Sequence, residues 1–465
     1  MGNKNIFFLL PDGGGLRNFV YSDFYKIFTE KGYNVTYWNG ACFPIKEKLS
    51  FREVKIKKAS THGLTSVFSR ARKRIELNLF TKKFEDRVYQ MYKFPLSYNN
   101  IGNSIKSLLV STLEFLGSNN VGLNFVKKQI HKYERSTQRY LDCKLQLEEH
   151  KPHLVFCSNQ RNTQAIAPLL AAKDLGIKTA CFIQSWDNVP KAMLVLETDY
   201  YYVWSELMKE ELLKYYSFIN QNQVIVSGTP QFEAHYDETL IESKSAFFEK
   251  YGLDCSKKYI CYSGDDETTS PLDQYYLEDL ANAVRSLNNK GNNLGIIFRR
   301  CPVDFSKRFD EIIAENKDII ISIDPIWKEY GDIVKGRYPE DEDYKLLSNI
   351  CEHSELVTNV CSSTVFDFVA HQKPCVYYNY EQPQLKKGIR DIGQNYKYVH
   401  FRSMPTKDAV IFCESKESLE KIMESTLEGK ISNVKDGTQW YHIIVGQDPS
   451  KSTQNILKSM NKIFA

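Results

Sequence analysis

The strongest constraint on the fold is the alternation, from residue 151 onward, of short continuous apolar runs with helical segments. The apolar runs include LVFCS, TACFI, YYYVW, VIVSG, YICYSG, GIIF, LVTNVC and CVYYNY. Continuous apolar strands that are separated by helices are typical of a parallel sheet covered by helices on both faces. The pattern therefore predicts an α/β fold built on parallel sheets.

The length of the chain indicates two such sheets. A chain of 465 residues is too long for one ordinary core and suits two domains of roughly 200 residues each. The opening NIFFLL-PDGGGLRN-FVYSDFYKIFTEKG-YNVTYWNG is typical of a strand, turn, helix and strand. We predict two Rossmann-like, doubly wound domains, residues 1–240 and residues 241–465, which face a cleft. Whether the last helix returns to the first domain is left open.

Residues 44–150 break the α/β rhythm and are predicted to form a helical, basic insertion in the first domain. Residues 46–83 contain twelve Lys or Arg against three Asp or Glu, whereas the whole chain carries a net charge of only +4. A basic surface of this kind is either simply solvated or contacts an anionic partner such as a membrane surface. No nucleic-acid-binding motif accompanies it, so a nucleic-acid partner is not expected.

The cysteines argue against a metal or disulfide framework. All eleven are scattered without a CxxC pair, and several lie in apolar runs, which indicates a reducing compartment. The acidic stretch Asp265, Asp266 and Glu267 is interpreted as a loop cap rather than as a metal site.

The N-terminal apolar run is too short for a signal peptide, and no run approaches the ~20 residues of a membrane span. We expect a cytoplasmic protein, with peripheral contact at the inner face of the membrane left open.

Ligands of open parallel sheets bind beyond the carboxyl ends of the strands, so the residues there are candidate site residues. Ser362, Ser363 and Thr364 follow the strand LVTNVC and precede a helix. Free N–H groups and short hydroxyls at a helix start favour an anion, while a plain helix cap needs only one such residue. We interpret the run as a phosphate site, with Asp367 holding the loop, binding a sugar hydroxyl or compensating the helix dipole.

Two other strand ends of the second domain add to this phosphate site. Arg299 and Arg300 follow GIIF, and a guanidinium group matches phosphate oxygens. Because successive residues of a strand point to opposite faces, we expect one of the two arginines to reach the site. Ser263 and Gly264 close YICYSG, where small residues permit close approach of a ligand to the backbone.

The first domain offers two polar strand ends. Asp12, Gly14 and Arg17 lie in the glycine-rich turn after the first strand. Trp186, Asp187 and Asn188 lie in IQSWDNVPK after a later strand. A Trp ring can lie against a sugar, and a carboxylate can accept a proton.

These segments together resemble the two-Rossmann-domain (GT-B type) glycosyltransferases. The similarity rests on DYYYVWSELMKEELLKYY, VIVSGTPQFEAHYD, GIIFRRCP, LLSNICEHSELVTNVCSSTVFDFVAHQKPCVYY and the closing helix. SWDN is similar to a stretch of bacterial surface-carbohydrate members. The resemblance covers residues 151–380 and, more weakly, 1–40.

The resemblance implies metal-independent transfer of a sugar from a nucleotide-sugar co-substrate to a surface-polysaccharide or lipid-linked acceptor, without a further cofactor. Residues after the second-domain strands would hold the donor: Ser263, Gly264, Arg299, Arg300, Ser362, Ser363, Thr364 and Asp367. Asp187 and Asp12 are the candidate bases. Gly14, Arg17, Trp186 and Asn188 are predicted to bind the acceptor.

Three alternatives remain. A CDP-polyol phosphotransferase of the teichoic type shares the Ser-Ser loop, but related members carry an R-x-H-P element where this chain has Arg299-Arg300-Cys301-Pro302. The missing histidine counts against a CDP-polyol or CMP-sugar donor. A nucleotide-sugar 2-epimerase has a similar fold and usually places several histidines in the cleft. A non-catalytic module that binds a nucleotide or carbohydrate is the alternative outside the enzymes.

Overall fold

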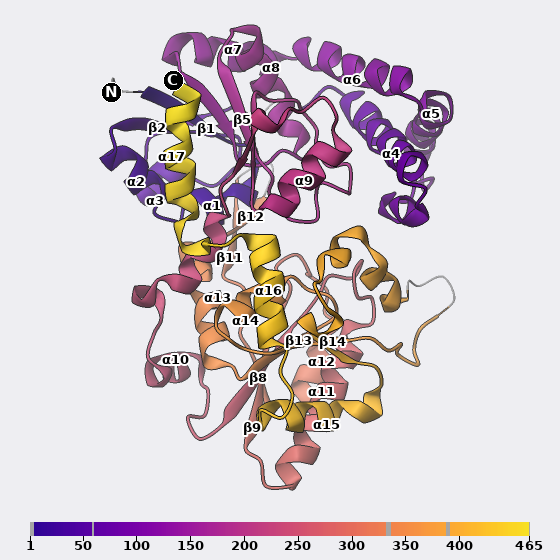
Figure 1. Cartoon of the computed structure of the whole chain (residues 1–465), viewed down its shortest axis with the longest axis vertical. Coiled ribbons are helices and arrows are strands. Elements are labelled where there is room, and N and C mark those ends of the chain that lie inside the picture. The colour runs from indigo at the N-terminus through magenta and orange to yellow at the C-terminus, as the bar shows by residue number, and fades with distance from the viewer. Residues whose placement is uncertain (1–3, 58–59, 332–335, 387–390, 465) are drawn as a thin grey trace. The chain divides into compact units, whose positions relative to one another are not determined.

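The computed structural model describes residues 4–57, 60–331, 336–386 and 391–464 (Figure 1). The chain divides into two compact units. Unit 1 comprises residues 1–231, 329–338 and 444–465, and unit 2 comprises residues 232–328 and 339–443. Unit 1 is therefore assembled from three separate stretches of the sequence.

Unit 1 is built on a seven-stranded sheet with the order β3-β2-β1-β4-β5-β6-β7, and all of its neighbouring strands run parallel. The strands are β1 (Lys4–Leu10), β2 (Tyr33–Asn39), β3 (Glu53–Lys55), β4 (Leu154–Cys157), β5 (Lys178–Phe182), β6 (Tyr200–Val203) and β7 (Val224–Val226). Both sets of alternate residues in the central strands β1 and β4 are buried, as the unbroken apolar runs predict.

The helices of unit 1 come from both ends of the chain. They are α1 (Leu16–Phe19), α2 (Phe24–Glu30), α3 (Ile45–Leu49), α4 (Thr65–Phe84), α5 (Ile101–Gly117), α6 (Asn120–Arg135), α7 (Gln138–His150), α8 (Ile166–Asp174), α9 (Glu206–Tyr215) and α17 (Ser452–Phe464). The last helix, α17, packs against α2, and Ser459 on it is hydrogen-bonded to the Tyr202 hydroxyl at 2.5 Å (Figure 1). Ile456, Met460 and Ile463 form its buried face.

Unit 2 is built on a six-stranded parallel sheet with the order β10-β9-β8-β13-β14-β15. Its strands are β8 (Lys258–Ser263), β9 (Leu294–Arg299), β10 (Ile320–Ser322), β13 (Leu356–Asn359), β14 (Cys375–Tyr378) and β15 (Ile411–Cys413). Its helices are α10 (Lys244–Tyr251), α11 (Asp273–Asn289), α12 (Asp310–Glu315), α13 (Asp341–His353), α14 (Thr364–Ala370) and α15 (Lys416–Leu427). Helix α16 (Val434–Val445) extends across residue 443, where unit 2 ends. The strands β11 (Trp327–Tyr330) and β12 (Gly336–Pro339) form a separate two-stranded sheet.

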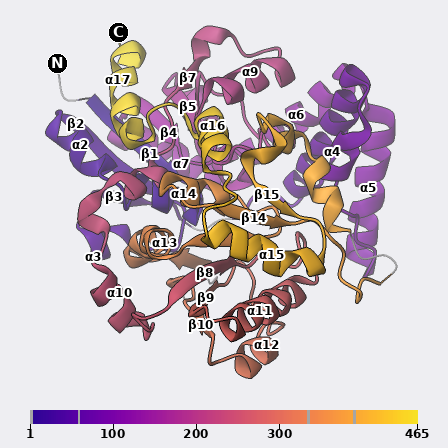
Figure 2. The ribbon, with the colours of Figure 1, turned by 60° about the horizontal axis from the view of Figure 1, so that its bottom comes forward.

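Helices cover both faces of the sheet in unit 2. One set of alternate strand residues, including Ile260, Ile296 and Val376, forms a core with residues of α11 and α15. These two helices pack against each other on one face of the sheet (Figure 2). The intervening residues, such as Cys261 and Ile297, are also buried, and α13 packs against β8. Two parallel α/β sheets, each with Rossmann-like alternation, confirm the predicted fold class.

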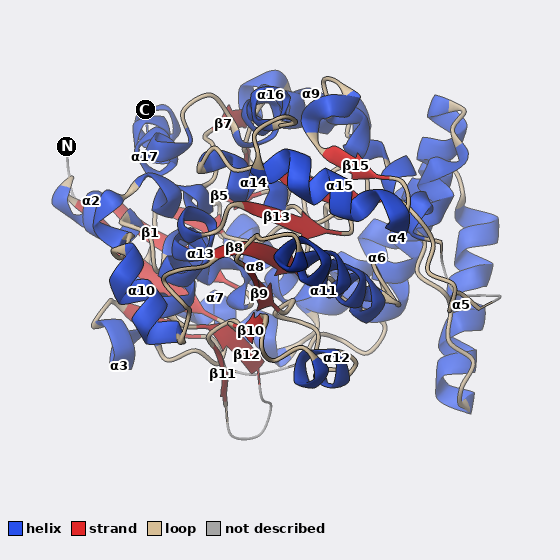
Figure 3. Cartoon of the chain, turned by 90° about the horizontal axis from the view of Figure 1, so that it is seen from below, coloured by secondary structure: helices blue, strands red, loops and turns tan. Residues whose placement is uncertain are grey.

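The helices α4 to α7 form the predicted insertion between β3 and β4, and α4 packs against both α5 and α6 (Figure 3). The short edge strand β3 within residues 44–150 was not predicted, because three residues are too few to give a periodic pattern. Two arginines of the basic stretch, Arg72 and Arg74, form ion pairs within unit 1. Arg72 forms an ion pair with Glu76 and donates to the carbonyl oxygens of Ala192 and Leu194, and Arg74 forms an ion pair with Glu114.

Candidate functional site

Three hydroxyl groups meet at the carboxyl ends of β8 and β13. The Thr364 hydroxyl lies 3.0 Å from the Ser263 hydroxyl and 2.9 Å from the Ser362 hydroxyl. The loop between β13 and α14 is fixed by Asn359, whose side-chain oxygen accepts a hydrogen bond from the Ser362 N–H at 2.8 Å. Two of the three consecutive hydroxyl residues thus join Ser263 in one cluster.

Helix capping does not account for the hydroxyl run. Ser363 occupies the cap position of α14, yet its side chain makes no capping hydrogen bond and is exposed. The Ser362 hydroxyl lies 3.4 Å from the Thr364 N–H, which is long for a hydrogen bond. Hydroxyl hydrogens rotate, so this cluster can turn its donors toward an anion.

Arg299 supplies a positive charge on the same side of the sheet as Ser263. The two residues are register partners on β9 and β8, so their side chains share a face. Nη2 of Arg299 donates to Asp343 at 2.9 Å. Its Nη1 is buried and has no hydrogen-bond partner. A buried guanidinium donor without a partner is costly, and an incoming anion would satisfy it.

Arg300 points to the other face of the sheet. Its guanidinium lies over the rings of Phe298 and Phe309, at 5.8 and 5.4 Å from their centroids. It donates to the carbonyl oxygen of Ser306 at 2.7 Å and lies 3.3 Å from Asp310. The structure therefore separates the two arginines and does not bring Arg300 to the hydroxyl cluster.

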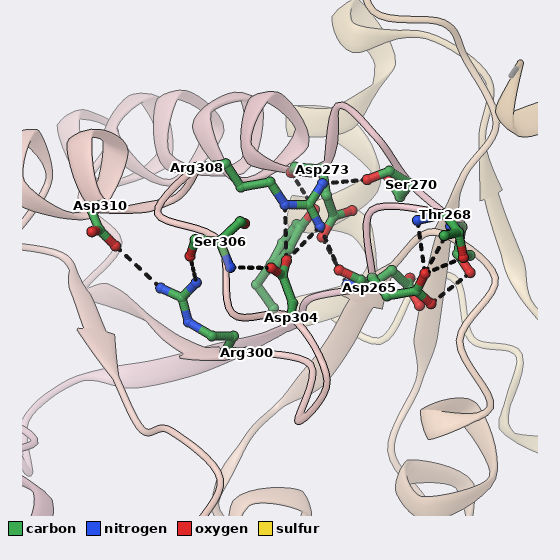
Figure 4. A network of polar contacts seen from close by, with 12 residues as sticks. Asp265, Thr268, Ser270, Asp273, Arg300, Asp304, Ser306, Arg308 and Asp310 are labelled. Atoms are coloured by element: carbon green, nitrogen blue, oxygen red, sulfur yellow. Dashed lines mark hydrogen bonds and ion pairs between the residues drawn. The ribbon is translucent and has the colours of Figure 1, made fainter. Parts of the chain in front are cut away.

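The acidic loop after Gly264 closes on itself (Figure 4). The Asp265 N–H donates to the Asp273 carboxylate at 2.9 Å. The Arg308 guanidinium donates to the Asp265 carbonyl oxygen at 2.6 Å and is paired with Asp304 at 2.8 Å. Burial raises the pKa of Asp273 to about 6 and raises the pKa of Asp265 as well. Among the described residues, no group of three or more His, Cys, Asp or Glu is arranged to hold a metal.

Asp367 belongs to a chain of titratable groups that the sequence reasoning missed. Its carboxylate lies 2.9 Å from Nε2 of His235, and Nδ1 of His235 lies 3.0 Å from His371. Nδ1 of His371 in turn lies 2.8 Å from the carboxylate of Glu352. Burial lowers the pKa of His371. The spacing of four residues between Asp367 and His371 on one helix is the signal that could have found this chain.

In unit 1, the three glycines after β1 are required by close packing. A Cβ atom on Gly13 would lie 2.1 Å from the Tyr338 ring, and one on Gly14 would lie 2.2 Å from the Gln184 amide. A Cβ atom on Gly15 would lie 2.5 Å from the Ser158 hydroxyl. The glycines therefore leave room at the carboxyl end of β1 for the side chains of Tyr338, Gln184 and Ser158.

Asp12 is held by three N–H donors. Its carboxylate accepts from the Gly14 N–H at 2.9 Å, from the Asn159 amide at 2.8 Å and from the Asn162 amide at 2.6 Å. Asp12 caps the short helix that contains the glycines. Arg17 lies in the following helix α1, and its buried Nε has no hydrogen-bond partner.

Asp187 lies in the loop after β5 and is also held by neighbouring side chains. It accepts hydrogen bonds from the Ser185 hydroxyl and the Asn188 amide, both at 2.7 Å, and is paired with Lys191. The adjacent Trp186 is buried. Burial, together with the charge of Lys191, lowers the pKa of the nearby Lys73 to about 8.

Side-chain amides connect the two strand ends of unit 1. Gln160 donates to the Asn188 side chain at 3.1 Å and accepts from the Gln184 N–H at 3.0 Å. Its neighbour Asn159 donates to Asp12. The buried sequence Ser-Asn-Gln directly after β4 was overlooked in the sequence, although polar residues at that point of an apolar strand are a usable signal.

The comparisons with known proteins agree with this architecture. The sequence profile of the family described as CDP-Glycerol:Poly(glycerophosphate) glycerophosphotransferase matches residues 184–458. No curated protein matches the chain. None of the helices within the described residues is long and apolar enough to cross a membrane.

Solved structures share the fold of the whole chain. They include a provisionally named UDP-N-acetylglucosamine 2-epimerase from Listeria monocytogenes (11% identity, 100% of this chain and 97% of that chain covered, TM-score 0.57). A glycosyltransferase from Rickettsia africae has 11% identity, coverage of 100% and 99%, and a TM-score of 0.52. Staphylococcus aureus MnaA, solved with UDP, has 11% identity, coverage of 99% and 97%, and a TM-score of 0.51.

At such identities the structural likeness establishes the GT-B fold alone. The family match extends from the loop that contains Asp187 through the whole of unit 2, which is more than half of the chain. The protein therefore belongs to the CDP-glycerol:poly(glycerophosphate) glycerophosphotransferase family, whose fold is that of the GT-B glycosyltransferases.

Proposed function

We propose that the protein transfers a polyol phosphate from a nucleotide-activated donor, with CDP-glycerol as the first candidate, to a hydroxyl of a surface polymer or lipid-linked glycan. The observation that carries this proposal is the family match over residues 184–458. The matched segment contains the hydroxyl cluster, Arg299 and the loop of Asp187. A nucleotide donor is further supported by the related fold that was solved with UDP.

The hydroxyl cluster and Arg299 are assigned to the phosphates of the donor. Breaking the bond to a nucleotide leaves negative charge on its phosphate, and donors that are already in place stabilise that charge. Ser263, Ser362 and Thr364 provide three hydroxyls, and Nη1 of Arg299 provides a charged donor without a present partner. We propose that these groups serve the reaction without a metal. Unchanged turnover in EDTA is the expected result.

Asp187 is assigned as the base. The acceptor oxygen would attack the phosphorus that carries the polyol, the bond from that phosphorus to the bridging oxygen would break, and CMP would leave with the electron pair. The acceptor proton would pass to the carboxylate of Asp187. Asp187 is preferred to Asp12 because it lies within the segment that matches the family, whereas Asp12 lies outside that segment and accepts three N–H donors.

One observation favours a second candidate, which is glycosyl transfer from a nucleotide-sugar. Cys301 lies where similar enzymes that use CMP- or CDP-linked donors carry histidine. Burial raises the pKa of the Cys301 thiol to about 12, so the thiol stays neutral and is a weak donor to phosphate. In this candidate the acceptor oxygen would attack the anomeric carbon, and a nucleoside diphosphate would leave.

The first test is ligand-induced stabilisation of the full chain by CDP, CMP, UDP, GDP and dTDP. A nucleotide at one hundred times its dissociation constant adds about 2.7 kcal/mol to the free energy of unfolding. Ser362→Ala should weaken the stabilisation, whereas the matched variant Ser363→Ala, whose hydroxyl lies outside the cluster, should leave it nearly unchanged. If no nucleotide stabilises the wild type, the phosphate assignment is wrong.

The second test identifies the leaving group. The chain is incubated with CDP-glycerol or a UDP-sugar and a polyglycerophosphate or lipid-linked glycan acceptor. Release of CMP supports phosphotransfer, and release of UDP supports glycosyl transfer. Binding without release from either donor would contradict both enzymatic proposals and favour a binding module.

A further inference from the structure

Four ionisable side chains of unit 2 form a linear network that the proposed transfer step does not use. The network runs from Glu352 on α13 through His371 and His235 to Asp367 in the first turn of α14. Its contacts measure 2.8 Å from Glu352 to Nδ1 of His371, 3.0 Å between the two rings, and 2.9 Å from Nε2 of His235 to Asp367. The side chains of His235 and His371 are only 1% and 4% exposed.

The three contacts of the linear network require three hydrogens. A carboxylate accepts but does not donate, so Nδ1 of His371 and Nε2 of His235 must each carry a hydrogen. The contact between the rings joins Nε2 of His371 to Nδ1 of His235, and it needs one hydrogen as well. Two neutral imidazoles carry only two N–H groups in total. Without one additional proton, one of the contacts would therefore set two lone pairs against each other.

The histidine pair is suited to one additional proton and not to two. Two positive charges on rings in contact would repel each other, and burial lowers the pKa of His371, with a further contribution from the neighbouring His235. The Ser348 hydroxyl lies 3.2 Å from Nδ1 of His235 and can either donate or accept, so it does not change the number of hydrogens required. With one proton, the pair supplies a single cation between two carboxylates.

The groups around the two carboxylates leave this cation as the buried partner of Asp367. Cys351 of α13 and Tyr441 of α16 lie near Asp367, and burial raises the pKa of both, so both stay neutral. The hydrogen bond with His371 lowers the pKa of Glu352, which stays ionised. The other ionisable groups near Glu352, at the exposed end of the network, are Lys373 and His353.

Helix α14 connects the linear network to the proposed phosphate site. Asp367 lies one helical turn after Thr364, whose hydroxyl belongs to the cluster with Ser263 and Ser362. Besides burial, which has the largest effect, the charges of both Asp367 and Arg299 act on the pKa of the Cys351 thiol. The net charge at Asp367 therefore acts on an anion that is held at the start of α14.

We propose that His235 and His371 share one proton more than two neutral imidazoles hold, and that this buried cation positions Asp367 and favours binding of the donor phosphate. The effect on the donor rests on the proposed function, whereas the number of protons does not. Release of the proton changes the linear network from one net negative charge to two and removes one of its hydrogen bonds. Both changes disfavour an anion at the hydroxyl cluster.

The number of protons is tested by urea unfolding of the full chain between pH 6.5 and 9. Above a pH of about 6.5 the histidines of the unfolded chain are neutral, so only the folded protein holds the additional proton. The stability that this proton contributes is complete at lower pH and is lost as the pH rises, until the network releases it. The ratio of folded to unfolded protein should fall by up to about tenfold per pH unit from this cause.

Two amide variants should remove this loss. In Asp367→Asn the new amide donates to Nε2 of His235, and two neutral rings then satisfy all three contacts. In Glu352→Gln the amide donates to Nδ1 of His371, and the same holds with the hydrogens in the reverse direction. Glu315→Gln, a matched change at an exposed glutamate of α12, should retain the wild-type dependence on pH. The exposed position of Glu352 ensures that at least one amide variant folds.

The effect on the donor site is tested with CDP and Glu352→Gln, because His371, the partner of Glu352, lies about 10 Å along α14 from Thr364. Relative to this variant, the wild-type dissociation constant for CDP should rise by about threefold or more between pH 6.5 and 9. The phosphate of CDP titrates equally in both measurements, so the comparison isolates the network.

The remaining outcomes separate this proposal from the proposed function. A wild-type unfolding profile parallel to those of both amide variants would overturn the additional proton. Loss of the dependence in Asp367→Asn but not in Glu352→Gln would confine the proton to one contact and contradict sharing by the pair. CDP binding with the same pH dependence in wild type and variant would overturn the positioning role and leave the phosphate assignment intact. Absence of CDP binding would contradict the proposed donor, while the unfolding data, which involve no nucleotide, still decide the number of protons.

Discussion

The carboxyl ends of the two sheets differ in the polar groups that they present and in how far these groups already have hydrogen-bond partners. In unit 1, Asp12 and Asp187 have their oxygens occupied by N–H, hydroxyl and ammonium donors, and other side chains pack against the glycines after β1. In unit 2, the hydroxyl cluster shares a face of the sheet with Nη1 of Arg299, which, like Nε of Arg17 in unit 1, is buried without a hydrogen-bond partner. A site with unsatisfied cationic donors is suited to an incoming anion, whereas one that holds carboxylates in place is suited to accepting a proton.

The largest effect is expected from the carboxylate of unit 1. Asp187→Asn keeps the shape of the side chain but removes the basic oxygen, so turnover should fall by about 10² to 10⁴ while nucleotide-induced stabilisation stays unchanged. Steady-state rates and thermal shift on the same preparation check this. The control is Asp12→Asn, which should reduce stability more than turnover. Full activity of Asp187→Asn would remove it from the role of base.

The next largest effect is expected from Arg299 of unit 2, compared with its neighbour Arg300. Arg299→Met leaves Asp343 buried without its ion pair and should lower the free energy of unfolding by about 3 to 5 kcal/mol, together with loss of nucleotide binding. Arg300→Met breaks a pair with the exposed Asp310 and should cost less than about 1 kcal/mol. Denaturant unfolding measures both variants. Similar losses in the two would contradict the assignment of Arg299 alone to the phosphate.

A smaller effect tests the close packing at the glycines after β1 in unit 1. Gly15→Ala places a methyl group against Ser158 and Leu10 and should cost about 1 to 3 kcal/mol by overpacking. Gly63→Ala is the matched change, since a Cβ atom there meets nothing within 4 Å. Comparison of their unfolding midpoints decides whether the glycines after β1 are required for packing.

The smallest effect concerns the acidic loop of unit 2. The pKa of Asp273 is raised to about 6 in the folded protein, above its unfolded value. Its contribution to stability is therefore complete below the unfolded pKa and is lost as the pH rises through about 6. Between pH 5 and 7 this loss should be about 1 kcal/mol. Asp273→Asn should flatten that part of the stability profile; an unchanged slope would show that another group causes it.

The sequence was most informative where a pattern was local. Continuous apolar strands predicted both sheets, and small polar residues at the strand ends led to Ser263, Ser362 and Thr364, which the fold brings together. The sequence did not reveal interactions between residues that lie far apart along the chain. The ion pair of Arg299 with Asp343 and the contact of Asp367 with His235 depend on loops that spacing does not describe.

The donor also illustrates a limit of residue-level reasoning. The absence of histidine at Cys301 counted against a CDP-polyol donor, whereas the profile over residues 184–458 places the chain in the family of such enzymes. The residue at a single position is weaker evidence for the family than the match of many segments in the same order. Likewise, the charge of residues 46–83 was visible in the sequence, but the ion pairs of Arg72 with Glu76 and of Arg74 with Glu114 were not.

The assembly of unit 1 from three stretches has a consequence for synthesis on the ribosome. Unit 2 ends at residue 443, so its sheet can close while the following residues are still being translated. Unit 1 lacks α17 until later, and until then the Tyr202 hydroxyl has no Ser459 to bond. The first sheet to be translated is thus the last to receive all of its covering helices, and a nascent chain carries an unfinished unit 1 throughout the translation of unit 2.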